Sequence, residues 1–185
     1  MSGVPDFQHG LLAAIPHLRA FAIGLCNKAD RADDLVQETL VRAWANRGGF
    51  QPGTNLTAWL YTILRNAFYT DYRKRRYEVA DTDGQYAAML AHRPLQESHI
   101  AFQEFRVALA KLPDDQREAL LLVGSSGLSY EEAAQICGCA LGTMKSRVYR
   151  ARVRLAAMLS VTTTELHRQG SEWDAVVDAK SDAAD

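Results

Sequence analysis

The stretch SYEEAAQICGCALGTMKSRVYRARVRL, residues 129–155, is acidic and apolar in its first half and basic in its second. Its last fifteen residues carry five Lys or Arg and no acid, although the 185-residue chain has a formal net charge of only -1. Ser129 and Glu132 form a capping box, which predicts the start of a short helix. Gly138 lies in a turn that favours a positive φ, and a second, amphipathic helix follows it. Short helix, glycine turn and amphipathic helix together make the helix-turn-helix plan.

The second helix of this stretch has an apolar face and a cationic face. The spacing predicts that Leu141, Met144, Val148, Ala151 and Leu155 face a core. The outward residues are Thr143, Lys145, Ser146, Arg147, Tyr149, Arg150, Arg152 and Arg154. Such donors contact DNA phosphates and base edges. The alternative is an Arg-rich helix face that is only solvated, but such a face would carry acidic residues at i,i+4, and these are missing here. The pattern therefore favours a helix that enters the DNA major groove.

A second basic segment, RNAFYTDYRKRR at 65–76, holds five cations and one acid at the end of a regular helical pattern. This helical pattern covers residues 55–72, and Asn55 is the expected N-cap of the helix. Cations mixed with aromatic rings are typical of single-stranded nucleic-acid sites, where bases stack on the rings. Trp59 and Phe68 lie on the apolar stripe and favour a core position. The better candidates for exposed rings are Tyr61, Tyr69 and Tyr72.

The composition is that of an ordinary globular protein, with 48% hydrophobic and 23% charged residues. We see no unbroken apolar run of membrane-spanning length and no signal peptide, so we expect a cytoplasmic protein without a membrane segment. Three cysteines, Cys26, Cys137 and Cys139, are too few for a disulfide framework and lack paired histidines for a zinc site. We therefore expect free thiols, no metal and no cofactor.

Helical spacing throughout predicts an all-α protein with two small helical domains joined by a flexible linker. The expected helices are 9–26, 31–47, 55–72, 98–111, 114–124, 129–137 and 141–159. Pro16 requires a kink or a late start in the first helix. Asp30 is the expected cap of the second helix. The expected divisions are a first domain at 5–76, an acidic linker at 77–99, a helix-turn-helix domain at 100–160 and an acidic tail at 161–185, disordered or weakly helical.

Four segments in order resemble the extracytoplasmic-function sigma factors of bacterial RNA polymerase. They are DDLVQETLVRAW, FQPGTNLTAWLYTILRNAFYTDYRKRR, LPDDQREALLL and GLSYEEAAQICGCALGTMKSRVYRARVRL, and the resemblance covers roughly residues 8–160. Within these segments, the sequences FQPGTNLTAWLYTILRN and EEAAQICGCALGTMKSR are most similar to the alphaproteobacterial general-stress-response group. The resemblance implies a sigma factor that binds core polymerase, directs promoter-specific initiation, is regulated by an anti-sigma protein and is a monomer when free.

The resemblance also assigns roles to residues. Contacts with the clamp helices of the largest polymerase subunit would come from Asp34, Gln37, Glu38 and Arg42, with Leu35 or Val41 adding apolar area. Contacts with the promoter −10 element would come from Asn55, Trp59, Arg65, Asn66, Arg73, Lys74, Arg75 and Arg76. A GGAA-type −35 element would be read by Lys145, Ser146, Tyr149 and Arg150, with Thr143, Arg147, Arg152 and Tyr130 on the DNA backbone. The acidic linker would enter the interior of the polymerase.

Three other classes of protein fit the sequence less well. A sigma-like decoy that sequesters an anti-sigma protein would need an attached receiver domain and would not need the cations at 145, 147 and 150. A helix-turn-helix repressor would not explain the aromatic and basic first domain. For an enzyme, the sequence offers no P-loop, no metal quartet and no paired Ser/His/Asp cluster.

Overall fold

The structure is a computed structural model that describes residues 3–79 and 97–159, with side chains over 7–75 and 102–159. The first group of helices is α1 (Gly3–Cys26), α2 (Ala29–Ala45), the 3-10 turn η1 (Arg47–Gly49) and α3 (Leu56–Val79). The second group is α4 (Glu97–Ala110), α5 (Asp114–Leu120), the π-turn η2 (Leu121–Ser125), α6 (Tyr130–Cys137) and α7 (Leu141–Met158). No strand occurs within these ranges, so the all-α prediction is confirmed.

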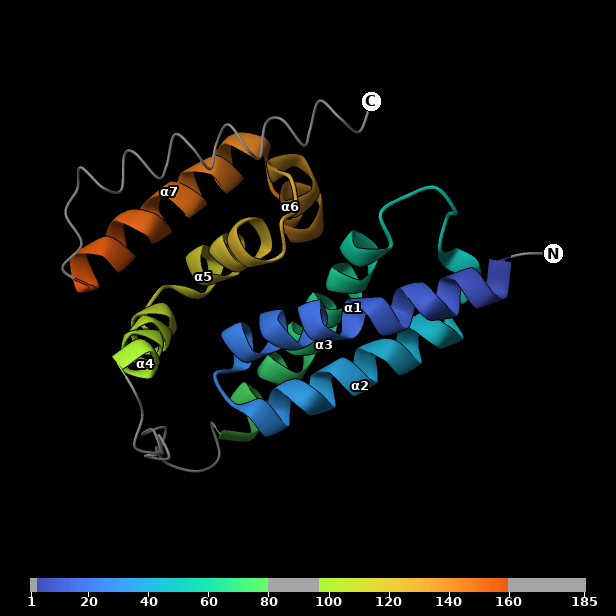
Figure 1. Cartoon of the computed structure of the whole chain (residues 1–185), viewed down its shortest axis with the longest axis horizontal. Coiled ribbons are helices and arrows are strands. Elements are labelled where there is room, and N and C mark those ends of the chain that lie inside the picture. The colour runs from blue at the N-terminus through green and yellow to red at the C-terminus, as the bar shows by residue number, and fades with distance from the viewer. Residues whose placement is uncertain (1–2, 80–96, 160–185) are drawn as a thin grey trace.

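The first three helices pack around one apolar core. α1 and α2 run antiparallel side by side, and α3 crosses behind them (Figure 1). Leu18, Leu60 and Leu64 are fully buried, and Phe68 is buried as its place on the apolar stripe predicted. Tyr61 was expected to be exposed and is instead fully buried, 4.8 Å from Phe21 between ring centroids. The prediction was wrong because α3 is covered on two sides, by α1 and by the second group of helices.

One of the two expectations about helix starts was wrong, and the other is narrowed. α1 contains Pro16 and begins at Gly3, which excludes a late start and leaves the kink that the sequence also allowed. The N-cap of α2 is Lys28, which makes no side-chain cap, and Asp30 lies in the first turn instead. Acids in a first turn still interact favourably with the helix dipole. The prediction for α3 is confirmed, because Asn55 Oδ1 accepts a hydrogen bond of 3.2 Å from the backbone N–H of Ala58.

The helix-turn-helix forms as its sequence signals predicted. The Ser129 hydroxyl accepts from the Glu132 N–H at 3.1 Å, and Glu132 Oε2 accepts from the Ser129 N–H at 2.9 Å. Gly138 ends α6 in the left-handed conformation, with φ 63°. Met144, Val148 and Ala151 of α7 are fully buried, as expected. Leu141 is 38% exposed, because it lies at the first position of the helix, before the buried stripe begins.

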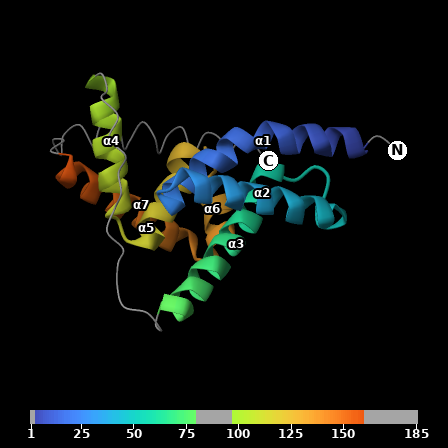
Figure 2. The same ribbon diagram turned by 90° about the horizontal axis from the view of Figure 1, so that it is seen from below.

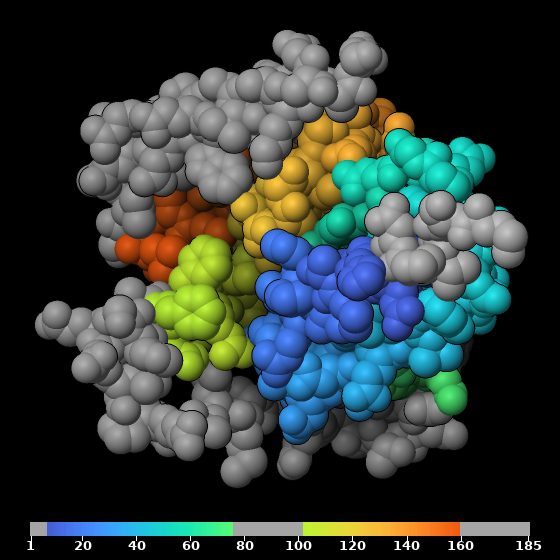
Figure 3. Space-filling model, turned by 45° about the vertical axis from the view of Figure 1, so that its right-hand side comes forward, coloured from blue at the N-terminus to red at the C-terminus, as the bar shows by residue number. Residues whose placement is uncertain are grey.

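The two groups of helices lie against each other and share one continuous cluster of buried residues. α1 contacts α5 and η2, and α3 contacts α6 (Figure 2). A Cβ added at Gly24 of α1 would come within 2.7 Å of Leu121 of η2, so the glycine permits this close approach. Figure 3 shows the surface of α1 in direct contact with the gold surface of the second group. Most of the predicted acidic linker and the predicted tail lie outside the described residues.

One part of α1, Phe7–Cys26, has the length and mean hydropathy, 1.3, of a segment that could cross a membrane. This stretch supplies Leu18, Phe21 and Ala22 to the shared core, where all three are fully buried. A third of this window is buried inside the protein, where α1 packs against α2 and α3.

Candidate nucleic-acid interface

The cationic face of α7 is directed away from the core. The exposed residues on this face are Thr143, Lys145, Tyr149 and Arg150, and Tyr149 is 61% exposed. The Ser146 hydroxyl donates to the Thr143 carbonyl at 2.9 Å, and an Arg150 Nη2 lies 3.5 Å from the Ser146 oxygen. These side chains follow one ridge of a helix that is held rigidly by its buried opposite face. The exposed face of α7 can therefore contact a DNA groove while its opposite face stays packed in the core.

Three of the residues expected to contact the DNA backbone are engaged within the protein. Arg147 Nε lies 3.2 Å from Asp115 Oδ2, so a carboxylate of α5 partly neutralises this cation. Tyr130 is only 5% exposed and lies beneath Lys145, whose Nζ is 5.5 Å from the ring centroid. The expectation that Tyr130 itself faces DNA is corrected here, because its ring supports Lys145 instead. Arg152 is half-buried and makes contacts within the protein.

An aromatic cluster joins α1, the loop before α3 and the first turn of α3. Trp59 packs on Phe50 at 5.5 Å and on Phe7 at 6.2 Å, measured between ring centroids. The sequence allowed Trp59 to be either a core residue or a platform on which a base stacks. It is half-buried, which is intermediate between the two. Asn55 is exposed at the rim of this loop. Its amide nitrogen donates to Glu132 Oε1 of α6 at 2.6 Å.

Arg65 is the most constrained of the predicted −10 residues. Its Nε donates to Glu118 Oε1 at 2.8 Å, and its guanidinium lies over the Tyr69 ring at 4.9 Å. Burial lowers the pKa of Arg65, but the charge and hydrogen bond of Glu118 outweigh it and leave the pKa raised. Burial, with Glu118 adding to it, also raises the pKa of Tyr69. Arg65 is therefore a fixed cation in this structure.

A polar cavity of about 430 Å³ lies on the same side of α3. Its walls are formed by Arg65, Asn66, Tyr69, Thr70 and Arg73. Asn66 is exposed there, and the Arg73 Nε donates to the Tyr69 carbonyl at 3.2 Å. Two guanidiniums, an amide and a phenol ring offer donors for phosphate and a surface for a base.

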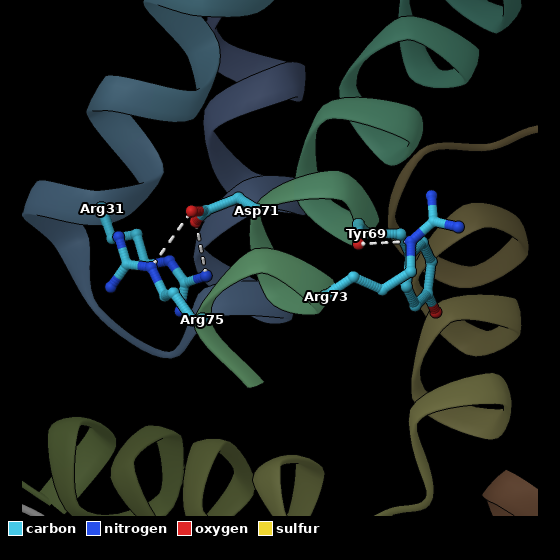
Figure 4. Close-up of polar contacts among 5 residues, drawn as sticks. All are labelled: Arg31, Tyr69, Asp71, Arg73 and Arg75. Carbon is cyan, nitrogen blue, oxygen red and sulfur yellow. Dashed lines mark hydrogen bonds and ion pairs between the residues drawn. The ribbon is translucent and has the colours of Figure 1, made fainter. Parts of the chain in front are cut away.

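The basic end of α3 projects beyond the other helices (Figure 2). Figure 4 shows Asp71 held between Arg31 and Arg75 on one side of α3, with Tyr69 and Arg73 on the other. The Asp71 carboxylate accepts from Arg31 at 2.7 Å and from Arg75 at 3.1 Å. Lys74 is exposed, and the side chain of Arg76 lies outside the described residues. Among the described residues, Arg73 and Lys74 are thus the cations of this end that face solvent without an acidic partner in an ion pair.

The predicted docking face on α2 is only partly on the surface. Exposed residues are Asp34, Gln37, Glu38, Val41 and Arg42, and Glu38 pairs with Arg42 at 2.6 Å. Leu35 is 6% exposed, so of the two apolar candidates it belongs to the core. Val41 is 69% exposed and is the one that can contact a partner.

An apolar groove that the sequence did not predict lies between α1 and α2. It encloses about 510 Å³ and is lined by Gln8, Leu11, Leu12, Ile15, Leu40, Val41, Trp44 and Ala45. Leu12 and Trp44 remain 57% and 41% exposed. The spacing of apolar residues predicted both helices. It could not show that apolar side chains of α1 and α2 meet in one groove that stays uncovered. The partners Glu118 and Glu132 were also missed, because no local pattern links them to α3.

Comparison with known proteins gives the same two parts. The family model of sigma-70 region 2 matches residues 12–77, and that of sigma-70 region 4 matches residues 102–155. The ECF RNA polymerase sigma factor EcfG of Rhodopseudomonas palustris is 66% identical over 160 residues, 86% of this chain and 88% of that protein. The ECF RNA polymerase sigma factor SigC of Mycobacterium tuberculosis is 40% identical over 68% of this chain and 69% of its own length.

A solved structure is similar over most of the fold. It is that of the sigma factor RpoE in complex with the anti-sigma factor NepR from Bartonella quintana. The likeness has a TM-score of 0.79 at 55% identity and covers 85% of this chain and 99% of RpoE.

Proposed function

Because this chain belongs to the extracytoplasmic-function sigma factors of RNA polymerase, we propose how its surfaces divide the recognition of a promoter. As a sigma factor, it binds core polymerase and directs promoter-specific transcription initiation. The likeness to EcfG and to RpoE supports assignment to the general-stress-response group. The domain boundaries we propose are 5–76, 77–99, 100–160 and 161–185.

The exposed cationic face of α7 reads the −35 element. The observation that carries this proposal is the arrangement of Lys145, Tyr149 and Arg150 on one ridge opposite a fully buried stripe. Arg and Lys recognise guanine through O6 and N7, and hydroxyl groups contact base edges or phosphates. Lys145 and Arg150 are therefore the base readers, with Ser146 and Tyr149 beside them. Thr143, Arg147 and Arg152 are backbone contacts.

The loop before α3 and the cavity along α3 take the melted −10 strand. Asn55 and the half-buried ring of Trp59 lie where an extruded base would be held, and Arg65 and Asn66 line the polar cavity. Unstacking a base costs a few kcal/mol, which stacking and edge contacts offset. Arg73, Lys74, Arg75 and Arg76 extend the positive charge toward upstream duplex phosphates.

The α2 face binds the clamp helices of core polymerase through Asp34, Gln37, Glu38, Val41 and Arg42. The apolar groove beside Val41 extends this face onto α1 and gives it the apolar area that the four polar contacts lack. An anti-sigma protein is a second partner, by analogy with the RpoE complex. The chain acts in the cytoplasm as a polymerase subunit, with no catalytic chemistry of its own.

Run-off transcription with purified chain and purified core polymerase tests this function. One template carries a GGAA-type −35 element, and a matched template carries a scrambled one. We expect transcript from the first template alone. Core binding without transcript from either template would contradict promoter recognition, and loss of core binding as well would favour a decoy or a repressor.

A further inference from the structure

One of the proposed base readers rests on an aromatic ring. The Nζ of Lys145 lies over the face of the Tyr130 ring, 5.5 Å from its centroid. An ammonium in this position is attracted by the negative potential of the ring face. Tyr130 is itself only 5% exposed, so most of its surface is packed inside the protein. The ring is therefore a fixed support for a side chain that is exposed.

The start of α6 fixes the position of this ring. Tyr130 is the first residue of α6 and directly follows the N-cap Ser129. The capping box encloses it, with hydrogen bonds of 3.1 and 2.9 Å between Ser129 and Glu132. α6 in turn packs against α7, which carries Lys145 (Figure 1). The ring is thus held by contacts that do not depend on Lys145.

A ring supports a cation differently from a carboxylate. Arg147, two positions further along α7, has its Nε 3.2 Å from Asp115 Oδ2. A carboxylate accepts the N–H donors of a cation and partly neutralises its charge. An aromatic ring attracts an ammonium without adding a negative charge. Lys145 is therefore held in place with its full charge, whereas Arg147 is held at the expense of part of its charge.

We propose that Tyr130 is a positioning residue for the −35 element, which acts through Lys145 and sets how well the chain distinguishes one base sequence from another. The inference rests on the proposed function, because it requires Lys145 to read a base. A lysine is a flexible point charge, and it binds phosphates as well as guanine O6 and N7. A support that orders the side chain before binding lowers the entropic cost of one contact geometry. The Tyr130 ring therefore favours a base edge over the phosphates around it.

Proton NMR of the full chain tests the contact without DNA. Protons that lie over an aromatic ring resonate upfield of their ordinary position. We expect this shift for the ε-methylene protons of Lys145 in the parent and in Tyr130→Phe, and its loss in Tyr130→Leu. A Lys145 resonance that Tyr130→Leu leaves unmoved would overturn the proposal.

The second readout is base discrimination by the holoenzyme. It is the ratio of the dissociation constants for promoter duplexes with a scrambled and with a GGAA-type −35 element. We expect Tyr130→Leu to lower this ratio by at least about threefold, while Tyr130→Phe keeps it. An equal loss in Tyr130→Phe would assign the effect to the hydroxyl group, as for a phosphate contact, and would overturn the proposal.

A fluorinated ring keeps the test valid if Tyr130→Leu does not fold. Pentafluorophenylalanine in place of Tyr130 retains an aromatic ring of similar shape but reverses the potential of its face. Circular dichroism should be unchanged, and discrimination should fall as it does in Tyr130→Leu. Discrimination equal to that of Tyr130→Phe would show that the ring acts by packing alone and would overturn the proposal.

A double-mutant cycle separates positioning from a structural role. In the Lys145→Met background, Tyr130→Leu should have no further effect on discrimination, because the cation that it positions is gone. In the Arg154→Met background, which lacks an exposed cation outside the proposed reading set, Tyr130→Leu should keep its full effect. A loss that persists without Lys145 would overturn the proposal.

The same cycle distinguishes failure of the inference from failure of the proposed function. Normal discrimination by Tyr130→Leu beside defective Lys145→Met would refute the positioning role alone. Lys145→Met that discriminates like the parent would refute the proposed role of Lys145 as a base reader, and the inference with it.

Discussion

The Nε of Arg65 lies 2.8 Å from Glu118 Oε1, and this ion pair joins the two domains where the side chain of Glu118 is only 2% exposed. Its surroundings include the Tyr69 ring on one side and the Cys137 thiol on the other. The same cluster therefore links a proposed DNA contact, the domain interface and two groups with shifted pKa values. Its titration gives a first prediction.

We expect Cys137→Ser to make the protein less sensitive to alkaline pH. Burial, with the Glu118 charge adding to it, raises the pKa of Cys137 from its ordinary value of 9.0 to about 12. Since the folded state disfavours the thiolate, stability is fully present below pH 9 and is lost as the pH rises toward 12. Urea unfolding should show the parent losing about 1–2 kcal/mol more than the variant between pH 9 and 10.5.

The raised pKa of Tyr69 leaves part of this alkaline loss in the variant. An equal slope in parent and variant would show that Cys137 does not titrate in the folded cluster. A loss that begins below pH 8 would also contradict the assignment, because no thiol with a raised pKa ionises there.

Gly138→Ala should destabilise the protein, although nothing lies within 4 Å of the added Cβ. The cost arises from the backbone, because φ is 63° at this position and the left-handed region costs an L-residue about 1–2 kcal/mol. Gly142→Ala on α7 is the matched control, since it adds a Cβ into equally open space within a regular helix. Thermal unfolding should show a stabilisation of up to about 1 kcal/mol there. Changes of the same sign at both sites would refute the backbone argument.

Asp34→Arg combined with Gln37→Arg should weaken binding to core polymerase without lowering stability. Both side chains are exposed on α2, so reversing the charge at 34 and adding a positive charge at 37 changes the surface and leaves the core intact. Binding is measured by titrating labelled chain with core polymerase, and we expect at least about a tenfold loss.

Leu35→Ala separates docking from folding on the same helix. Leu35 is 6% exposed, so the variant should lose about 2–3 kcal/mol of stability through the cavity it leaves. Its folded fraction should still bind polymerase normally. Weak binding by folded Leu35→Ala, or normal binding by the double arginine variant, would move the docking surface elsewhere.

The sequence predicted most features that depend on neighbouring residues. The capping box of Ser129 and Glu132, the left-handed Gly138 and the Asn55 cap each need only a few residues of chain, and all three form. The buried stripe of α7 follows from a period of 3.6 residues, which is also local. The helices of the second domain were therefore recovered closely, whereas α1 begins before its predicted start at 9 and α3 continues beyond its predicted end at 72.

Features that depend on which helices meet were not recovered. Tyr61 is fully buried against Phe21 of α1 and Tyr69 is half-buried, a difference that no spacing in residues 55–72 encodes. Leu35 and Val41 were equal candidates in sequence, yet one faces the core and the other faces solvent. Glu118 is the partner of Arg65 only in the folded arrangement, because the two residues lie 53 positions apart and no local pattern joins them.

The most direct test of the division of roles is Arg150→Ala, assayed in parallel for run-off transcription and for core polymerase binding. Arg154→Ala is the control, since Arg154 is an exposed cation of the same helix outside the proposed reading set. We predict that Arg150→Ala lowers transcription from a GGAA-type promoter by about tenfold or more with core binding unchanged, while Arg154→Ala stays near the parent. Full transcription by Arg150→Ala, or a loss of core binding along with transcription, would contradict the account.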